Sequence, residues 1–169
     1  MSTVVFTTME SPLGLLLLSG VRDGDGPAAL ATVTAPGQKG AVSEPADDWV
    51  CDPAALAAAV AQLTAYFAGE RTTFDLPLAP AGTEFRQRIW AALDEIPYGA
   101  TVTYGELALM AGVPPSAVRA VGGAVGANPL LVVRPCHRVM GASGALTGFA
   151  AGVERKRLLL DLEGGGTLF

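Results

Sequence analysis

The chain has 169 residues, of which 50% are hydrophobic and 16% charged, enough for an ordinary core in one domain or in two small ones. Its two distant cysteines, Cys51 and Cys136, provide no disulfide framework. Together with the single histidine they are too few for a structural zinc site, so we expect no bound metal. The net charge of −5 is spread unevenly, because residues 1–81 hold three basic and nine acidic side chains and residues 82–169 hold eight and seven. A polyanion would therefore meet the C-terminal half.

The first residues predict a small sheet. Residues 4–8 and 13–19 are rich in β-forming side chains on either side of a Ser-Pro pair at residues 11–12, which indicates a hairpin. Residues 29–34 predict a third strand, and residues 35–48, rich in Pro, Gly, Ser and Asp, predict a mobile loop.

The apolar run at residues 13–18 is not expected to meet a membrane. It follows Glu10, lacks a basic leader and is too short to span a bilayer. We therefore expect neither a signal peptide nor membrane contact, and we expect the protein in the reducing cytoplasm.

A helix and a linker follow. Asp52 as N-cap and Pro53 at the first position predict a helix that runs to about residue 68, where Gly69 stops it. Residues 76–83 are rich in proline and indicate a linker, so we expect domains at residues 1–80 and 81–169.

The second domain is predicted to begin with helices. Thr83 caps one helix that ends near residue 96, and another spans about residues 104–111. After a break at residues 112–115 a further helix is expected from Ser116, a good N-cap, to about residue 125. This spacing is typical of a helix-turn-helix. The second helix contains small residues and one cation, Arg119, and this pattern has two interpretations that we favour equally. The helix could approach a DNA groove closely and insert the arginine, or it could pack tightly against another helix with the arginine at the surface.

A short stretch joins Cys136 to His137, the only histidine. The apolar residues 130–133 between Pro129 and Pro135 predict a short strand that is an edge strand or an isolated piece, because proline cannot donate to a sheet ladder. Adjacent strand residues point to opposite faces, so we expect the thiol and the imidazole to cooperate through a water. A carboxylate would then orient the imidazole.

The terminal helix, predicted at residues 154–163, supplies that carboxylate. Glu163 is our candidate and Asp161 is its competitor. Residues 155–157, Arg-Lys-Arg, indicate a solvated basic face, with phosphate contact as the alternative. From the residues alone, a catalytic thiol and an inert buried cysteine both remain open.

The segment Pro135-Cys136-His137-Arg138-Val139 resembles the signature of the O6-alkylguanine-DNA alkyltransferases. Collinear likenesses follow the C-terminal half at Gly82-Thr-Glu-Phe, Ile96-Pro-Tyr-Gly, Tyr104-Gly-Glu, Arg119-Ala-Val-Gly, Asn128-Pro, Leu146-Thr-Gly-Phe and Glu154-Arg-Lys-Arg. The resemblance implies an α+β protein: a small N-terminal α/β domain like ribonuclease H, in a supporting role, and a mainly helical C-terminal domain with a helix-turn-helix of the winged-helix kind.

The resemblance also implies a reaction and a partner. An alkyl group, such as methyl, would pass irreversibly from O6 of guanine in double-stranded DNA to Cys136, once per protein molecule and without a cofactor, after the base is flipped out of the helix. O4-alkylthymine is a further candidate substrate. We expect a monomer in solution, with cooperative binding on DNA left open.

The resemblance implies a role for each matching residue. His137 would act through a water as base, Glu163 would orient it, and Asn128 would fix the turn that presents the cysteine. Tyr104 would push the backbone phosphate and donate to the guanine ring, and Arg119 would fill the gap left by the flipped nucleotide. Further DNA contacts are implied for Thr103, Ala120 and Gly122. The base edge would meet main-chain groups of Cys136 and Val139 and the loop of Thr147, Gly148, Phe149 and Ala150.

The chain departs from the family pattern at a few positions. Arg134 stands where an aliphatic residue is usual and puts a charge beside the cysteine. Phe149 replaces a common tyrosine in the base-binding loop, Leu158 replaces a frequent tryptophan, and the turn at residues 112–115 is one residue longer than is usual. These departures bear on rate, lesion range and DNA affinity.

Three other functions compete with alkyl transfer. A lesion sensor on the same scaffold would bind alkylguanine without reacting, but the presence of Cys136 argues against it. A helix-turn-helix transcription regulator would bind one undamaged sequence, which a smooth helix supports poorly. A Cys-His hydrolase would turn over an ester or an amide repeatedly.

Overall fold

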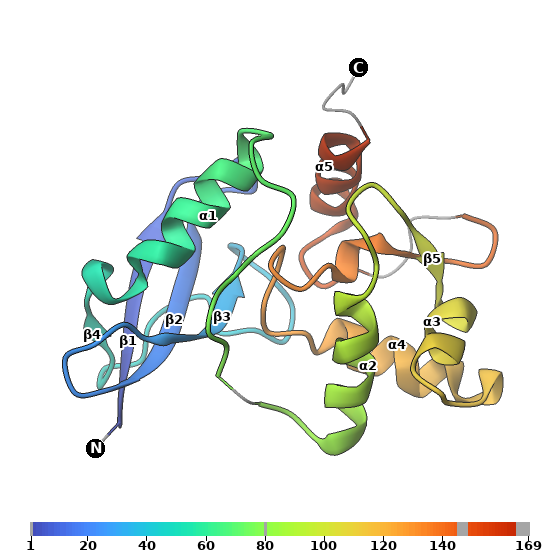
Figure 1. The fold of residues 1–169 in the computed structure, drawn as a ribbon, viewed down its shortest axis with the longest axis horizontal. Helices are drawn as coiled ribbons and strands as arrows, with labels where there is room; N and C mark the ends of the chain where they lie inside the picture. Colours follow the sequence, from blue (N-terminus) through green and yellow to red (C-terminus); the bar gives the residue numbers. More distant parts are fainter. Residues whose placement is uncertain (1, 80, 145–148, 165–169) are drawn as a thin grey trace. The chain divides into compact units, whose positions relative to one another are not determined.

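The computed structural model describes residues 2–79, 81–144 and 149–164, and in this part the fold divides into two compact units (Figure 1). The first unit contains Met1–Ala81 and Pro129–Val133, and the second contains Gly82–Asn128 and Arg134–Phe169. The predicted α+β class is confirmed, since a sheet organises the first unit and helices dominate the second. The roles that we assign to residues 1–80 and 81–169 stay a prediction.

The sheet of the first unit has the order β3-β2-β1-β4. Its strands are β1 (Ser2–Met9), β2 (Leu16–Asp23), β3 (Ala29–Thr34) and β4 (Val50–Cys51). β1, β2 and β3 are antiparallel neighbours, as the hairpin prediction requires, and β4 runs parallel to β1. The second strand begins later than predicted, because Leu13 N and the Gly14 carbonyl both hydrogen-bond the Ser11 hydroxyl and prolong the turn.

A helical segment follows β4 and covers part of this sheet (Figure 1). It begins as a 3-10 turn, η1 (Pro53–Leu56), and continues as α1 (Ala57–Phe67). The predicted cap is confirmed, since Asp52 Oδ1 accepts a hydrogen bond from Ala55 N at 3.3 Å. Leu63 and Tyr66 are fully buried and anchor the helix in the core of this unit.

Two distant segments cover the free edge of β3. At one end Leu30 exchanges backbone hydrogen bonds with residues 77–79, and at the other Val33 exchanges them with residues 129–131. An uncovered edge strand would expose unpaired backbone groups, so both segments satisfy β3. The stretch that leads to Cys136 is thus fixed to the first unit's sheet at its beginning.

The second unit is built from short helices. Its elements are α2 (Glu84–Asp94), β5 (Val102–Thr103), α3 (Tyr104–Met110), η2 (Pro115–Ala117), α4 (Val118–Gly126), η3 (Cys136–Arg138), β6 (Val139–Met140) and α5 (Val153–Glu163). β5 and β6 form a parallel pair that the sequence did not predict. Residues of α2, α3, α4, Cys136 and Val139 share one hydrophobic core. Among the described residues, no helix is both long and apolar enough to cross a membrane.

The helix-turn-helix is confirmed as α3, a turn and α4, with one correction at the second helix. Ser116 does not cap α4, because residues 115–117 form a 3-10 turn, and the N-cap is Ala117 without a side-chain hydrogen bond. α3 has the stronger start. Thr103 Oγ1 accepts from Glu106 N at 3.1 Å, and Thr103 N donates to Glu106 Oε1 at 2.9 Å.

The predicted strand at residues 130–133 is wrong in extent. Only Leu130 pairs with β3, and Val132 then turns the chain at φ 72, with Val133 N donating to Leu131 O at 2.8 Å. This is a γ-turn whose central residue is β-branched, a conformation that costs about 1–3 kcal/mol. The isolated nature of the pairing agrees with the expectation from Pro129, but Cys136 and His137 lie on a 3-10 turn rather than on a strand.

Candidate active site

Cys136 is the first residue of η3, and its side chain is 6% exposed. A second γ-turn precedes it, in which Cys136 N donates to Arg134 O at 2.7 Å across Pro135. The Asn128 side chain closes the same turn, because its Nδ2 donates to Arg134 O at 3.0 Å. The expected role of Asn128, to fix the segment that presents the cysteine, is consistent with this contact.

Several groups act on the thiol of Cys136. Burial raises its pKa above the ordinary value of a cysteine, since a thiolate is poorly stabilised away from water. Hydrogen bonding by Asn128 and the positive charges of Lys156 and Arg134 lower the pKa in the opposite direction. The site thus combines a desolvated sulfur with cations that favour its anionic form.

His137 and Glu163 form a buried pair. His137 Nε2 lies 2.7 Å from Glu163 Oε2, and both side chains are almost fully buried. Burial lowers the pKa of His137, against the raising effect of its bond to Glu163, so the imidazole is neutral near pH 7. With Nε2 donating to the carboxylate, Nδ1 is the basic nitrogen, and it has no hydrogen-bond partner in the described part of the chain. Glu163, rather than Asp161, is therefore the carboxylate that reaches the imidazole.

Arg138 holds the other side of Glu163. Its Nε donates to Oε1 at 2.7 Å and its Nη2 to Oε2 at 2.9 Å, while Nη1 donates to the Ile96 carbonyl at 2.6 Å. The guanidinium also lies 5.7 Å from the centroid of the Tyr98 ring. This bidentate clamp fixes the plane of the carboxylate and balances its charge, so Glu163 can orient the imidazole with little freedom of its own.

Lys156 corrects the prediction that residues 155–157 form a solvated face. Its side chain is 1% exposed, and Nζ donates to the Val139 carbonyl at 2.5 Å, beside the active-site turn. Burial lowers the pKa of Lys156, whereas the negative charge that Cys136 can carry raises it. Of the three basic residues only Arg157 is exposed. No individual role is predicted for Lys156 from the sequence, and the effect of its charge on the Cys136 thiol makes it a site residue.

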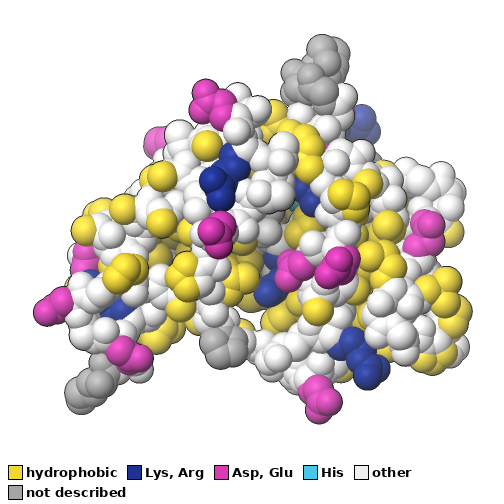
Figure 2. All heavy atoms as spheres, viewed as in Figure 1, with side chains coloured by type: hydrophobic (Ala, Val, Ile, Leu, Met, Phe, Trp, Pro, Cys, Tyr) yellow, Lys and Arg dark blue, Asp and Glu magenta, His cyan; other side chains and the backbone are white. Residues whose placement is uncertain are grey.

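The helix-turn-helix carries the residues expected to meet DNA. Arg119 and Ala120 are exposed on α4, whereas Val121, Ala124 and Val125 pack inward. A side-chain carbon added at Gly122 would lie 4.0 Å from the Tyr104 ring, so these two predicted site residues are neighbours. The hydroxyl of Thr103 is engaged in the cap of α3. Leu109, Met110 and Val118 are exposed nearby, and Figure 2 shows hydrophobic side chains on the surface over α3.

Three comparisons relate this chain to known proteins. The family model described as the 6-O-methylguanine DNA methyltransferase ribonuclease-like domain matches residues 4–80, and the model of the DNA-binding domain of the same family matches residues 84–165. The methylated-DNA–protein-cysteine methyltransferase of Mycolicibacterium paratuberculosis is 49% identical over 95% of this chain and 92% of its own, and that of Methanosarcina acetivorans is 48% identical over 94% and 97%. The chain belongs to the 6-O-methylguanine DNA methyltransferase family.

Solved structures of family members agree with this fold. The crystal structure of Mycobacterium tuberculosis OGT in complex with DNA matches with a TM-score of 0.83 and 48% identity over 95% of this chain and 92% of that one. The crystal structure of the M. tuberculosis O6-methylguanine methyltransferase matches with a TM-score of 0.82 and 47% identity over 99% and 95%. The implied ribonuclease-like and helical DNA-binding domains are thereby confirmed as the fold class.

The predicted base pocket is only partly described. Thr147 and Gly148 lie outside the described residues, and Phe149 and Ala150 are half-buried. The Phe149 ring centroid lies 5.7 Å from Lys156 Nζ, so the lysine links this family loop to the active-site turn. The backbone groups of Val139 are already engaged, because its N–H donates to Cys136 O and its carbonyl accepts from Lys156.

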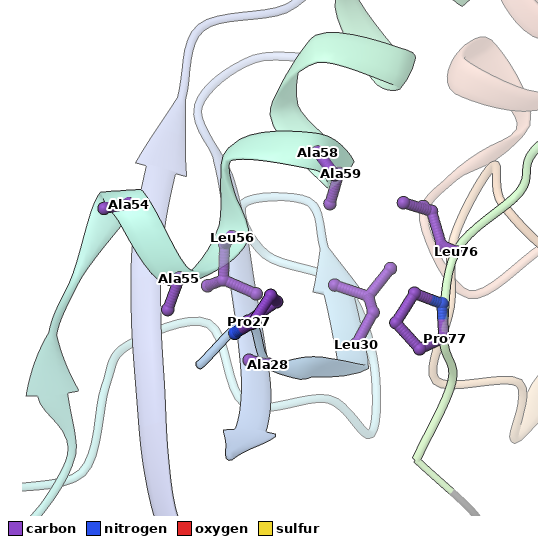
Figure 3. A pocket seen from close by; sticks show the side chains of 10 residues that line it. All are labelled: Pro27, Ala28, Leu30, Ala54, Ala55, Leu56, Ala58, Ala59, Leu76 and Pro77. Carbon is purple, nitrogen blue, oxygen red and sulfur yellow. The ribbon is translucent and has the colours of Figure 1, made fainter. Parts of the chain in front are cut away.

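A pocket in the first unit is unrelated to this chemistry. It measures about 160 Å³ and lies between the start of α1, the end of the β2–β3 loop and the chain after α1 (Figure 3). Its lining is entirely proline, alanine and leucine: Pro27, Ala28, Leu30, Ala54, Ala55, Leu56, Ala58, Ala59, Leu76 and Pro77. Such a lining offers no nucleophile, acid or base.

Proposed function

We propose that this protein repairs alkylated DNA by moving an alkyl group from O6 of guanine in double-stranded DNA to Sγ of Cys136. The observation that carries the proposal is the buried His137–Glu163 pair next to the cysteine in the chain, with the basic nitrogen of the imidazole buried and without a hydrogen-bond partner among the described residues. Its relatives are named methylated-DNA–protein-cysteine methyltransferases, and one related structure is a complex with DNA.

The reaction begins with removal of the thiol proton. His137 Nδ1 takes this proton through a water, because Glu163, itself held by Arg138, engages Nε2 and leaves Nδ1 as the basic nitrogen. Lys156 and Arg134 stabilise the resulting thiolate, and Asn128 hydrogen-bonds it. A neutral His137 is needed at this point, and its lowered pKa keeps it neutral.

Transfer is a displacement at the alkyl carbon. A sulfur lone pair forms the S–C bond while the C–O6 bond breaks, and the electron pair of that bond passes to the guanine ring, which accepts a proton from the Tyr104 phenol. The product is a thioether, which has no good leaving group. Cys136 is therefore not regenerated, and each protein molecule reacts once. We extend the same chemistry to O4-alkylthymine as a second substrate.

The reacting carbon lies inside a stacked duplex and must leave it to reach a buried sulfur. We assign this step to α4, whose exposed small residues allow close approach to a groove and whose Arg119 replaces the extruded nucleotide. Thr103, Ala120 and Gly122 would line the same surface. The base edge would meet the carbonyl of Val139, whose oxygen can accept a second hydrogen bond beside that from Lys156, and the loop of Thr147, Gly148, Phe149 and Ala150. We expect the protein to act in the cytoplasm as a monomer, with cooperative binding on DNA left open.

The test is intact-mass measurement after incubation with a duplex that contains one O6-methylguanine. We expect the mass of one methyl group on Cys136 and none on Cys51, which is an exposed free thiol and serves as an internal control. Cys136→Ser should bind the duplex but gain no mass, and Cys51→Ser should react like the wild type. Binding of the alkylated duplex without mass gain would identify a lesion sensor, and repeated turnover of an ester would identify a hydrolase.

A further inference from the structure

Arg134 carries a mostly buried positive charge beside the thiol. Its side chain is 13% exposed, its guanidinium carbon lies 4.9 Å from the centroid of the Trp90 ring, and its Nε lies 3.6 Å from Asp94 Oδ1. That distance gives an ion pair but no hydrogen bond, and Nε has no hydrogen-bond partner among the described residues. Burying a cation with so few partners lowers the stability of the fold. The charge of Arg134 therefore needs an explanation other than a contribution to stability.

The surroundings of Arg134 hold it in one place. Trp90 is itself fixed, because its Nε1 donates to the Ala124 carbonyl of α4 at 2.8 Å and its side chain is buried. The Arg134 carbonyl accepts hydrogen bonds from both Asn128 Nδ2 and Cys136 N. The backbone of Arg134 is therefore tied to the cysteine, and its guanidinium is stacked on a rigid aromatic surface.

Asp94 cannot fully balance this charge. Its side chain is 48% exposed on α2, so water screens it, and the separation of 3.6 Å lacks the short bidentate geometry that Arg138 has with Glu163. Part of the positive charge of Arg134 therefore remains available to a second anion. The Cys136 sulfur, two residues along the same turn, is the group that becomes anionic.

We propose that Arg134 is a positioning residue for alkyl transfer, which stabilises the thiolate of Cys136 by its buried charge, and that Asp94 limits how much of this charge acts on the sulfur. The proposal rests on the proposed function for its biological meaning, although its test does not require DNA. Under this proposal two cations stabilise the thiolate of Cys136: Arg134, which lies on the turn before it, and Lys156, which lies on α5.

The charged groups near the sulfur give the sign of each effect. Arg134 and Lys156 favour the thiolate. Asp94 on α2 is paired with Arg134, and Glu163 on α5 is paired with His137; by the sign of their charge, both carboxylates would oppose the thiolate. Removing Arg134 must then raise the pKa of the thiol, and neutralising Asp94 must lower it. A purely structural role of the Arg134–Asp94 pair predicts no such opposite pair of shifts.

The experiment compares Arg134→Leu, Arg134→Lys and Asp94→Asn in a Cys51→Ser background, so that Cys136 is the only thiol. Thiolate formation is followed against pH by ultraviolet absorbance and by the rate of reaction with iodoacetamide, and melting temperatures are recorded alongside. Below the thiol pKa we expect Arg134→Leu to hold about three- to tenfold less thiolate than the parent and Asp94→Asn to hold more. Arg134→Lys, which keeps the charge, should stay close to the parent.

The outcomes are separable. An unchanged thiol pKa in Arg134→Leu overturns the proposal, whatever happens to the melting temperature, and an unchanged or raised pKa in Asp94→Asn overturns the part assigned to Asp94. If Arg134→Leu unfolds, a thiol pKa in Arg134→Lys equal to the parent while Asp94→Asn shifts it down still supports the role of the charge. Failure of the wild type to take an alkyl group from DNA would reject the proposed function without changing these pKa measurements.

Discussion

The carboxylate of Glu163 lies 2.7 Å from Nε2 of His137, although 26 positions separate the two residues in the chain. Arg138, the next residue after the histidine, donates two hydrogen bonds to the same carboxylate. One side chain on α5 therefore fixes two consecutive residues of the η3 turn. The orientation of the imidazole therefore depends on the position of α5.

Replacing Glu163 with Gln should slow alkyl transfer about a hundredfold and lower the free energy of unfolding by about 3 kcal/mol. The amide keeps the shape of the side chain but removes the charge that stabilises imidazolium, and it leaves Arg138 buried without a counter-ion. Single-turnover rates with an alkylated duplex and urea unfolding measure the two effects. Asp161→Asn is the matched control on the same helix and should change neither the transfer rate nor the free energy of unfolding. Equal losses in both variants would show that the effect comes from the total negative charge of α5 and not from the contact between Glu163 and His137.

The pH dependence of stability should report on His137. Burial depresses the pKa of this histidine below its unfolded value of 6.5, so the unfolded chain takes up the proton first. The contribution of neutral His137 to the free energy of unfolding is fully present above about pH 6.5. It is lost as pH falls from about 6.5 to the folded-state pKa, at about 1.4 kcal/mol for each pH unit in that range. Urea unfolding between about pH 7 and pH 5.5 measures this slope.

His137→Gln provides the control for that slope. Because the chain has no other histidine, the variant lacks the side chain that normally titrates in this range. Its stability should be lower than that of the wild type at pH 7 but nearly constant down to about pH 5.5. The same acid slope in wild type and variant would assign the pH dependence to other groups.

Lys156→Met should weaken the thiolate and slow transfer near pH 7. The methionine fills the same space beside Phe149, but the cation is lost and the Val139 carbonyl loses its donor. We expect the pKa of Cys136 to rise and the transfer rate to fall about three- to tenfold. Arg157→Met makes the same change of charge one position along α5 at an exposed residue, so a similar fall there would argue against a local effect.

Much of the fold follows from local sequence signals. The hairpin, the Asp52 cap and the helix-turn-helix all come from patterns in neighbouring residues of the chain, and the structure contains each of them. The two-residue strands β4, β5 and β6 have no such signal, since two residues are too short to show alternation and pair only because tertiary contacts bring them together.

The site was less predictable than the fold, because burial decides the role of a charge. The Arg-Lys-Arg sequence gives no sign that Lys156 turns inward while Arg157 stays in water. Likewise, the residues alone do not separate Glu163 from Asp161. The segment that leads to Cys136 contains two γ-turns and pairs with β3 only at Leu130, so the prediction of a strand from the short apolar run at residues 130–133 is wrong in extent. From the residues alone Glu163 is the candidate partner of His137 with Asp161 as its competitor, and the resemblance favours Glu163.

Gly82→Ala should destabilise the second unit. Gly82 has φ 81, a region that alanine rarely adopts, and an added side-chain carbon would lie 2.4 Å from the Trp90 ring. Strain and overpacking together should cost about 2–4 kcal/mol. Thermal unfolding followed by tryptophan fluorescence measures this. Gly112→Ala is the control, because its φ of 73 carries similar strain with nothing within 4 Å, so an equal loss there would leave no contribution from Trp90.

Arg119→Ala should separate base extrusion from chemistry. Arg119 is exposed at the first turn of α4, whereas Cys136, His137 and Glu163 are buried, so we expect its removal to leave these three residues intact. We expect a fall of at least about tenfold in transfer from an alkylated duplex, because the gap left by the flipped base is no longer filled and extrusion costs a few kcal/mol. Transfer from free O6-alkylguanine, which needs no extrusion, should be almost unchanged.

Salt provides the second readout for Arg119. Its loss removes at most about one phosphate contact, so duplex affinity should keep nearly the same, shallow dependence on salt. This shallow slope is expected because Glu106 and Arg119 are the charged residues of the helix-turn-helix between Thr103 and Asn128. Arg119→Lys, which keeps the charge on a thinner side chain, should recover affinity more than rate. Equal losses with duplex and free base would instead mean that Arg119 supports the fold of the active site, and α4 would then need another residue to replace the extruded nucleotide.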